Sequence, residues 1–189
     1  MKRCEQFPGM SVLDHGMDVF ARYLDIISPE PKLKWRMPEW AAAMKPHQLP
    51  LNIMQHYLIY HDCGKPFCRT VDEDGKQHFT NHVQISYETW MKHAAIQLDG
   101  HDHWSPEDEQ IGDLIRADMD IHTIKGATAI DEFIKRPEAP SLILAGLAEI
   151  HSNASWLHQL DSDTFKIKWK QIDKIGKKLV ASLKEVAVY

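Results

Sequence analysis

The segment Tyr60–Thr70, YHDCGKPFCRT, places a histidine and an aspartate side by side at the end of an apolar stretch. His61 continues the apolar stripe of a helix that Pro50 can open and Gly64 can end. Asp62 is one position round that helix, where a half-buried carboxylate needs an ionic partner or a metal. Taken alone, the pair allows two interpretations: part of a metal site, or a helix end with a satisfied core histidine.

Further candidate ligands lie on helix faces that also carry apolar residues. Twelve of the 189 residues are histidines, and neutral imidazole is a common metal ligand. Asp118 and His122 are four residues apart, so a continuous helix would present both on one face. Several such side chains on different helices favour convergence on one ion. Besides His61 and Asp62, the candidates are His15, His82, Asp118, His122 and Glu149.

Length and composition predict one folded domain over residues 1–189, with a core at about 11–160 and a closing helix at about 163–187. The net charge of -5 gives no general basic footprint for nucleic acid. The first residues lack a signal-peptide pattern, and the longest apolar run, Leu142–Ala148, is too short to span a bilayer. Three cysteines, an odd count, are read as free thiols. We therefore expect a reduced, cytoplasmic protein without membrane contact.

Helical patterns dominate the sequence and predict an all-α protein. Ser11 can cap a first helix that stops before Ser28 and Pro29, and Ser105 starts another. No strand pair with hairpin chemistry stands out, and Val71–His78 is a short loop or a hairpin. The apolar stripe of the first helix is expected to be Leu13, Met17, Phe20, Leu24 and Ile27. The other helices are expected over 38–44, 50–62, 81–98, 127–135, 139–158 and 163–187.

These motifs resemble the HD superfamily of metal-dependent phosphohydrolases, and most closely the HD region of bacterial tRNA nucleotidyltransferases. The stretch His61–Ser86 contains His-Asp-x-Gly-Lys-Pro, an acidic loop with Asp-Gly, His-Phe, and a histidine that opens a helix. Ser11–Phe20, SVLDHGMDVF, looks like the family's preceding helix with its first histidine. The likeness covers about Ser11–Ala154. It implies a freestanding HD-domain helical bundle with the metal site in the bundle centre.

The resemblance also implies roles for single residues. His15, His61 and Asp62 fall on metal-ligand positions, and His82 falls on the additional histidine that holds a second metal or a phosphate. Lys65 falls on the Gly-Lys-Pro lysine, which suits a phosphate contact.

Two positions depart from the family pattern. Asp118 stands where relatives often have histidine, and Glu149 stands where the distal ligand is usually aspartate. Oxygen donors in place of nitrogen shift the preference toward harder ions such as Mn²⁺ or Mg²⁺.

The implied function is a phosphohydrolase: a phosphomonoesterase, a phosphodiesterase or a dNTPase. One or two divalent ions, with Mn²⁺, Mg²⁺, Co²⁺ and Ni²⁺ as candidates, would polarise phosphorus and activate water. Asp62 would bridge two ions or orient the nucleophile. Lys65 and His82 would stabilise charge on the phosphate oxygens, and His122 would protonate the leaving oxygen. The expected partner is a phosphorylated small molecule, a nucleotide, or an RNA end with a terminal or cyclic phosphate.

Two other hypotheses stay open. A catalytically weak HD module could bind a nucleotide for regulation, which the departures at Asp118 and Glu149 favour. A helical interaction protein could use all its histidines structurally, and would then hold no metal after purification without chelators.

The segment Lys166–Lys178, KIKWKQIDKIGKK, carries six lysines on one expected helix. A solvated face and a contact with an RNA backbone are the two interpretations.

Overall fold

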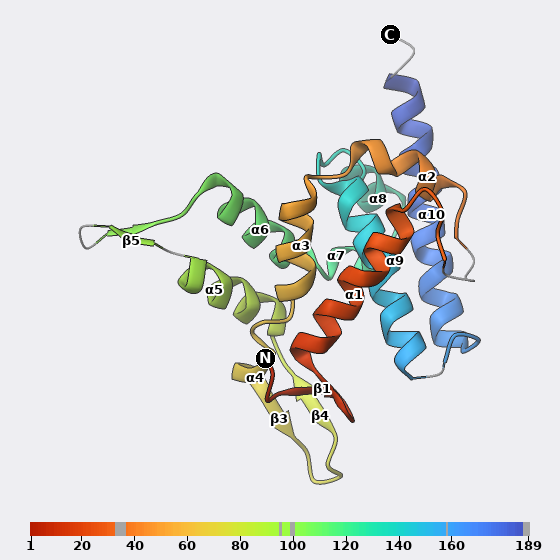
Figure 1. Cartoon of the computed structure of the whole chain (residues 1–189). Helices are drawn as coiled ribbons and strands as arrows, with labels where there is room; N and C mark the ends of the chain where they lie inside the picture. Colours follow the sequence, from red (N-terminus) through yellow and green to blue (C-terminus); the bar gives the residue numbers. More distant parts are fainter. Residues whose placement is uncertain (33–36, 95, 99–100, 158, 187–189) are drawn as a thin grey trace. The chain divides into compact units, whose positions relative to one another are not determined.

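The computed structural model describes residues 1–32, 37–94, 96–98, 101–157 and 159–186. Helices dominate this part of the chain (Figure 1), and its strands form three antiparallel two-stranded hairpins. The prediction of a helical protein is confirmed at this level. Apart from the hairpin left open at residues 71–78, the sequence showed no strand pair, because each hairpin has only two or three residues per strand, too few to show an alternating pattern.

The chain divides into two compact units. The first unit contains Met1–Asp18 and Leu51–Asp118, and the second contains Val19–Pro50 and Met119–Tyr189. Helix α1 (Val12–Ile27) begins in the first unit and ends in the second. The single domain over residues 1–189 stays a prediction, as does the end of its closing helix at position 187, which lies outside the described residues.

Helix α1 begins where the sequence predicts. The backbone N–H of Asp14 donates to Ser11 Oγ at 3.1 Å, and the Ser11 hydroxyl donates to the Asp14 carboxylate at 2.6 Å. This reciprocal cap satisfies N–H groups that the first helical turn leaves without a partner. The helix ends at Ile27, ahead of Ser28 and Pro29 as expected.

The buried face of α1 is not the predicted one. Met17 and Leu24, both in the predicted stripe, are 54% and 38% exposed. The buried face includes His15, Gly16 and Tyr23, which are only weakly hydrophobic. The apolar pattern of the sequence therefore predicted that the neighbouring face of the helix is buried. The buried positions are Val12, His15, Gly16, Val19, Tyr23 and Ile26.

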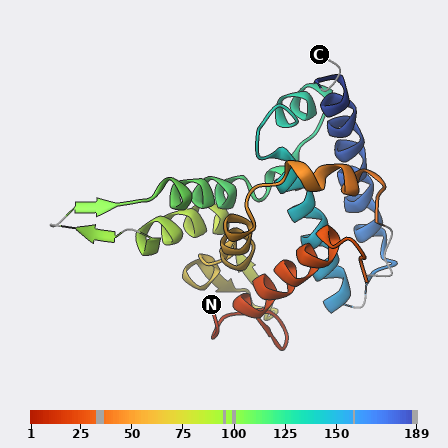
Figure 2. The ribbon, with the colours of Figure 1, turned by 45° about the horizontal axis from the view of Figure 1, so that its top comes forward.

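In the first unit, α3 (Leu51–Tyr60) packs on α6 (Pro106–Ala117), and α6 packs on α5 (His82–Ala94). Helices α5 and α6 run side by side in both ribbon views (Figures 1 and 2). The helix predicted to reach residue 98 ends at Ala94, and Ile96–Leu98 forms strand β5. Ser105 caps α6 through a capping box, as predicted. The remaining elements are β1 (Glu5–Phe7), β2 (Met10–Ser11), α4 (Lys65–Cys68), β3 (Arg69–Val71), β4 (Gln77–Phe79) and β6 (His101–His103).

The β3–β4 hairpin settles the choice left open for residues 71–78. Gly75 has φ 77°, a left-handed conformation that glycine adopts without strain, and its N–H donates to the Asp72 carbonyl at 3.0 Å. The Asp72 N–H donates in turn to the Lys76 carbonyl at 3.0 Å. The turn reverses the chain just ahead of α5, and thereby sets where His82 begins that helix.

In the second unit, α9 (Ala139–Trp156) is buried along most of its length and packs on α10 (Asp163–Val186). A helix that is apolar nearly all round belongs inside a core. Ring atoms of Trp40, on α2 (Trp40–Met44), would lie 2.3 Å from a Cβ added at Gly176, so α2 and α10 approach closely. The other elements are η1 (Lys45–His47), α7 (Asp120–Thr123) and α8 (Ala127–Phe133).

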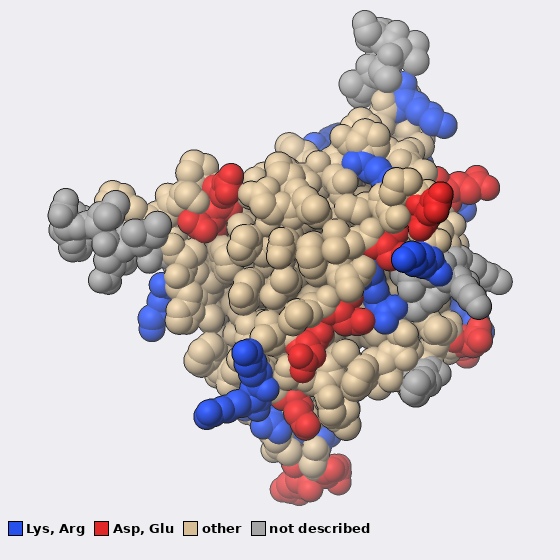
Figure 3. Space-filling model, in the orientation of Figure 1, with Lys and Arg blue, Asp and Glu red and all other residues tan. Residues whose placement is uncertain are grey.

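Charged side chains of both signs are scattered over the surface (Figure 3). On the face that Figure 3 shows, Lys and Arg side chains lie among Asp and Glu side chains. Among the described residues, no helix combines the length and the apolar character that crossing a bilayer requires.

We expect His151 to lower the free energy of unfolding as the pH falls. This side chain on α9 is 1% exposed, and burial lowers the pKa of His151 from its ordinary 6.5 to about 4. The folded state therefore binds fewer protons than the unfolded chain between these values, so its stability is complete above pH 6.5 and is lost as pH falls toward 4. The full loss is about 3 kcal/mol. Urea unfolding at several pH values in this range measures the free energy of unfolding of the wild type and of His151→Gln. Plotted against pH, the two free energies should converge at low pH, and parallel plots would contradict the lowered pKa of His151.

Candidate metal centre

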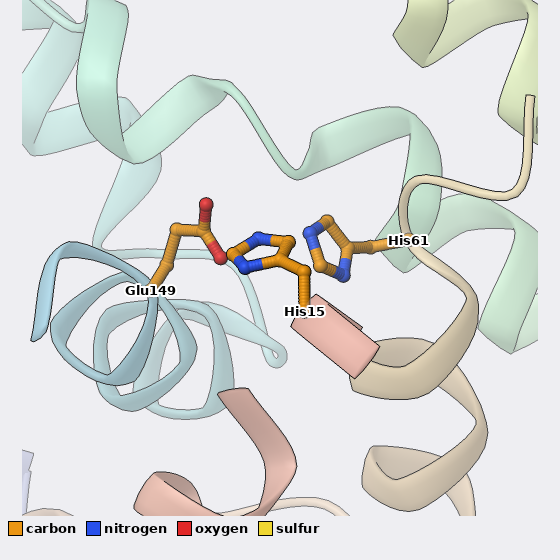
Figure 4. A group of neighbouring side chains, drawn as sticks. All are labelled: His15, His61 and Glu149. Carbon is orange, nitrogen blue, oxygen red and sulfur yellow. The ribbon is translucent and has the colours of Figure 1, made fainter. Parts of the chain in front are cut away.

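A close backbone contact brings α1 to the end of α3. A Cβ added at Gly16 would lie 2.3 Å from the carbonyl oxygen of Ile59, so only glycine fits there. His15 precedes this contact by one residue, and His61 follows it by two. Figure 4 shows the two imidazole rings next to each other, and their centroids are 5.4 Å apart. A ring nitrogen of His15 and one of His61 lie within 4.8 Å of each other.

The turn after α3 meets α5 in the same way. The helix ends at Tyr60, earlier than predicted, and His61–Gly64 forms a turn. A Cβ added at Gly64 would lie 2.3 Å from the backbone nitrogen of Ser86. The Gly64 N–H donates to Ser86 Oγ at 3.0 Å. Because Ser86 is one helical turn from His82, this contact brings His82 to the turn.

Asp62 lies where these segments meet and is 3% exposed. Its Oδ2 is 3.3 Å from Nε2 of His61 and 4.0 Å from Nε2 of His15. Its Oδ1 is 3.8 Å from Nε2 of His82. The Lys65 ammonium donates to Oδ2 at 2.5 Å. One buried carboxylate is thus surrounded by three imidazoles and one ammonium.

The second nitrogen of two of these imidazoles is held by the backbone. Nδ1 of His61 lies 2.8 Å from the Leu58 carbonyl, and Nδ1 of His82 lies 3.0 Å from the Phe79 carbonyl. A carbonyl oxygen only accepts, so each Nδ1 carries the proton. In the neutral ring, Nε2 then offers its lone pair on the side of Asp62, which is how backbone carbonyls orient metal-binding histidines.

The charge of Asp62 survives its burial. Desolvation by itself raises the pKa of Asp62, but the positive charge of Lys65, with contributions from the protonated forms of His61 and His15, outweighs it, and the pKa lies well below its usual range. The carboxylate is therefore ionised at neutral pH and available as a hard oxygen donor.

Lys65 is buried at 8% exposure, although a lysine is rarely buried without a partner. Besides Asp62, its ammonium donates to Gln6 Oε1 at 2.9 Å and lies 5.3 Å from the centre of the Phe79 ring. The expectation of a phosphate contact for Lys65 stays a prediction, and its observed contacts hold the ammonium at the carboxylate.

Without a bound metal, the side chain of Cys63 is a protonated thiol at neutral pH. Burial, followed by the charge of Asp62, raises the pKa of Cys63 to about 12. The thiol donates to the Ser86 carbonyl at 3.3 Å.

Two further predicted site residues, Asp118 and His122, belong to the segment of α6 and α7. Asp118 follows α6, and its Oδ1 accepts a hydrogen bond from the Tyr57 hydroxyl at 2.7 Å. His122 lies on α7 in the second unit. The helix breaks between them, so the prediction that Asp118 and His122 share one helix face is wrong. Their roles as ligand and as acid stay predictions.

Glu149, which Figure 4 also labels, belongs to α9 in the second unit. It is half-buried, and its Oε1 accepts a hydrogen bond from Asn153 Nδ2 at 2.7 Å. Its predicted role as the distal ligand stays a prediction.

Two contributors to this centre were missed in the sequence. Gln6 holds Lys65 from β1, a strand too short to leave a pattern. Gly16 sets the spacing of the two helices, and it did leave a signal: a glycine inside a helical pattern costs about 1 kcal/mol relative to alanine and often marks a close contact.

Comparisons with protein-family models, with curated proteins and with solved structures gave no match.

We expect Gly64→Ala to destabilise the protein by about 2–4 kcal/mol, because the added Cβ would meet the backbone of α5, which has little freedom to move. Gly75→Ala is the matched control: its added Cβ meets nothing within 4 Å, and it costs about 1 kcal/mol for the left-handed backbone. Urea unfolding measures both. Equal losses would show that the contact at Gly64 can relax.

Proposed function

We propose that this chain is an HD-type, metal-dependent phosphohydrolase that acts on a nucleotide or on a terminal or cyclic phosphate ester of RNA. The observation that carries the proposal is the ionised, buried Asp62 carboxylate with Nε2 atoms of three histidines within 4.0 Å of its oxygens. The motif resemblance around His61–Ser86 points to the same chemistry.

The donor set fits a divalent ion. Ligand nitrogens and oxygens bind such ions at about 2.0–2.2 Å, which puts neighbouring donors about 3 Å apart. The separations of 3.3–4.0 Å between Asp62 and the imidazoles of His15, His61 and His82 are close to that value. Imidazole with carboxylate suits Mn²⁺, Fe²⁺, Co²⁺, Ni²⁺ and Zn²⁺ better than Ca²⁺. We propose His15, His61, Asp62 and His82 as the residues that hold one or two ions.

A bound divalent ion supplies a Lewis acid for the phosphoryl oxygen and lowers the pKa of water. The chain's own side chains contribute the rest. Lys65 offers a positive charge that an anionic substrate can share with Asp62, in surroundings that exclude water. His82, with a side chain 24% exposed, is the most accessible of the three imidazoles and is suited to meet a phosphate.

A second candidate is a protein that binds a nucleotide without cleaving it. The direct ion pair between Lys65 and Asp62 favours it, because the ammonium already neutralises the charge that a metal ion would otherwise use.

The protein is expected to retain a divalent metal when purified without chelator, and to hydrolyse a member of a phosphoester panel with Mn²⁺, Mg²⁺, Co²⁺ or Ni²⁺. Asp62→Asn should lower metal content and reduce kcat/KM at least about 100-fold, since it removes the charged oxygen donor. Asp72→Asn, an exposed aspartate on the β3–β4 hairpin, is the matched control and should keep both. Bound nucleotide without turnover would favour the binding protein, and the absence of both metal and nucleotide binding would contradict both candidates.

Asp62→Asn also leaves the Lys65 ammonium buried without its counter-charge, so lost activity could reflect lost folding. The double variant Asp62→Asn with Lys65→Met removes both charges, and we expect it to regain stability in urea unfolding while staying inactive. Activity in the folded double variant would show that Asp62 has no part in the chemistry.

Glu149→Gln tests the predicted distal ligand. If Glu149 coordinates the ion, this variant should weaken metal affinity by about 10- to 100-fold, as measured by competition with a fluorescent chelator. Glu138→Gln, a half-buried glutamate at the N-cap of α9, is the matched control and should leave the affinity unchanged. Equal affinities in the two variants would remove Glu149 from the ligand set.

A further inference from the structure

Helix α10 already has its apolar face covered within the second unit. Ile172, Ile175 and Leu179 are each at most 2% exposed, and Gly176 lies against the Trp40 ring. The Trp40 indole N–H also donates to Asp173 Oδ1 at 3.1 Å. The face of α10 that remains is polar and open to solvent.

That face carries a row of lysines. At about 100° per residue, five lysines fall within an arc of about 80° on the side away from the buried isoleucines, and the first and last are about 27 Å apart along the axis. All five are exposed. We call them the lysine row: Lys166, Lys170, Lys174, Lys177 and Lys184.

The row is only partly neutralised. Lys177 pairs with Asp173 at 2.7 Å, and Lys178, which lies outside the arc, pairs with Asp131. The other four lysines of the row form no ion pair with any residue that the structure describes. Asp163, Asp173 and Glu185 are the acidic residues on or beside this arc, so the five lysines leave a surplus of two positive charges.

This surplus runs against the charge of the chain, which is -5 overall. Like charges one turn apart on a helix repel each other, so a row of them weakens the helix slightly unless a polyanion neutralises it. Duplex nucleic acid carries one phosphate per about 1.7 Å of axis, so a row of about 27 Å spans about eight base pairs of phosphates.

We infer that the lysine row of α10 binds the phosphodiester backbone of a nucleic acid, without reading its sequence. Lysine ammonium groups are point charges that contact phosphates but carry no base recognition by themselves. A membrane fits the row less well, because a basic amphipathic helix binds bilayers by inserting its apolar face, and that face is covered here. Ile167, 66% exposed, is a single apolar residue beside the row.

The inference uses residues of the second unit alone and does not depend on the proposed hydrolysis. It is tested by fluorescence anisotropy with labelled 20-base-pair RNA and DNA duplexes in EDTA, at 50–300 mM KCl. For the wild type, log K should fall with log [KCl] with a slope of about -3, since about three phosphates are neutralised. Binding of RNA, of DNA or of both supports the inference.

The variant Lys166→Gln, Lys170→Gln, Lys174→Gln should bind at least 10-fold more weakly at 50 mM KCl, and its slope should move toward zero by about 2–3. The matched control removes the same charge from exposed lysines elsewhere: Lys76→Gln, Lys92→Gln, Lys125→Gln. It should keep the wild-type slope. Circular dichroism confirms that both triple variants are folded.

Three results would overturn the inference. One is an equal loss in both triple variants, which would assign binding to net charge. Another is the lack of duplex binding by the wild type at 50 mM KCl. The third is binding to phosphatidylserine–phosphatidylcholine vesicles without binding to either duplex, which would assign the row to a lipid surface.

Discussion

The buried carboxylate of Asp62 imposes the strictest condition on the first unit. An isolated ionised carboxylate is costly to bury, and the cost is met here by the Lys65 ammonium at 2.5 Å and by imidazoles on three sides. Such an arrangement requires that β1, the first turn of α1, the turn after α3 and the first turn of α5 all lie close to one point. The same condition explains why Lys65 is buried. It also explains why the uncharged Gln6 side chain accepts a hydrogen bond from the Lys65 ammonium.

Two glycines satisfy that condition in the backbone. Gly16 lets α1 touch the carbonyl of Ile59, and Gly64 lets the turn touch Ser86. A methyl group at either position would separate the segments that carry His15 and His82 from Asp62. The chemistry proposed for the centre therefore depends on two glycines that contribute no side chain to it. A substitution at either glycine would act by increasing the distance between the imidazoles and Asp62.

The two units present different chemistry. The described contacts around Asp62 lie in the first unit, whereas the lysine row lies on α10 of the second. A buried centre with fixed imidazole tautomers suits coordination and the positioning of an anion. A row of exposed lysines suits a long polyanion, and its affinity falls steeply with salt.

The sequence by itself determined the helical class and the caps at Ser11 and Ser105, because local patterns carry that information. Its motifs also indicated the residues that lie together around one site, which are His15, His61, Asp62, Lys65 and His82. Tertiary structure decided which face of α1 is buried, since His15, Gly16 and Tyr23 are packed by their neighbours and not by their own hydrophobicity. It also decided that the helix breaks after Asp118, where no proline or glycine marks the end. Strand β1 is too short to leave a local pattern, and Gln6 and Lys65 are 59 positions apart, so their contact could come only from the folded chain.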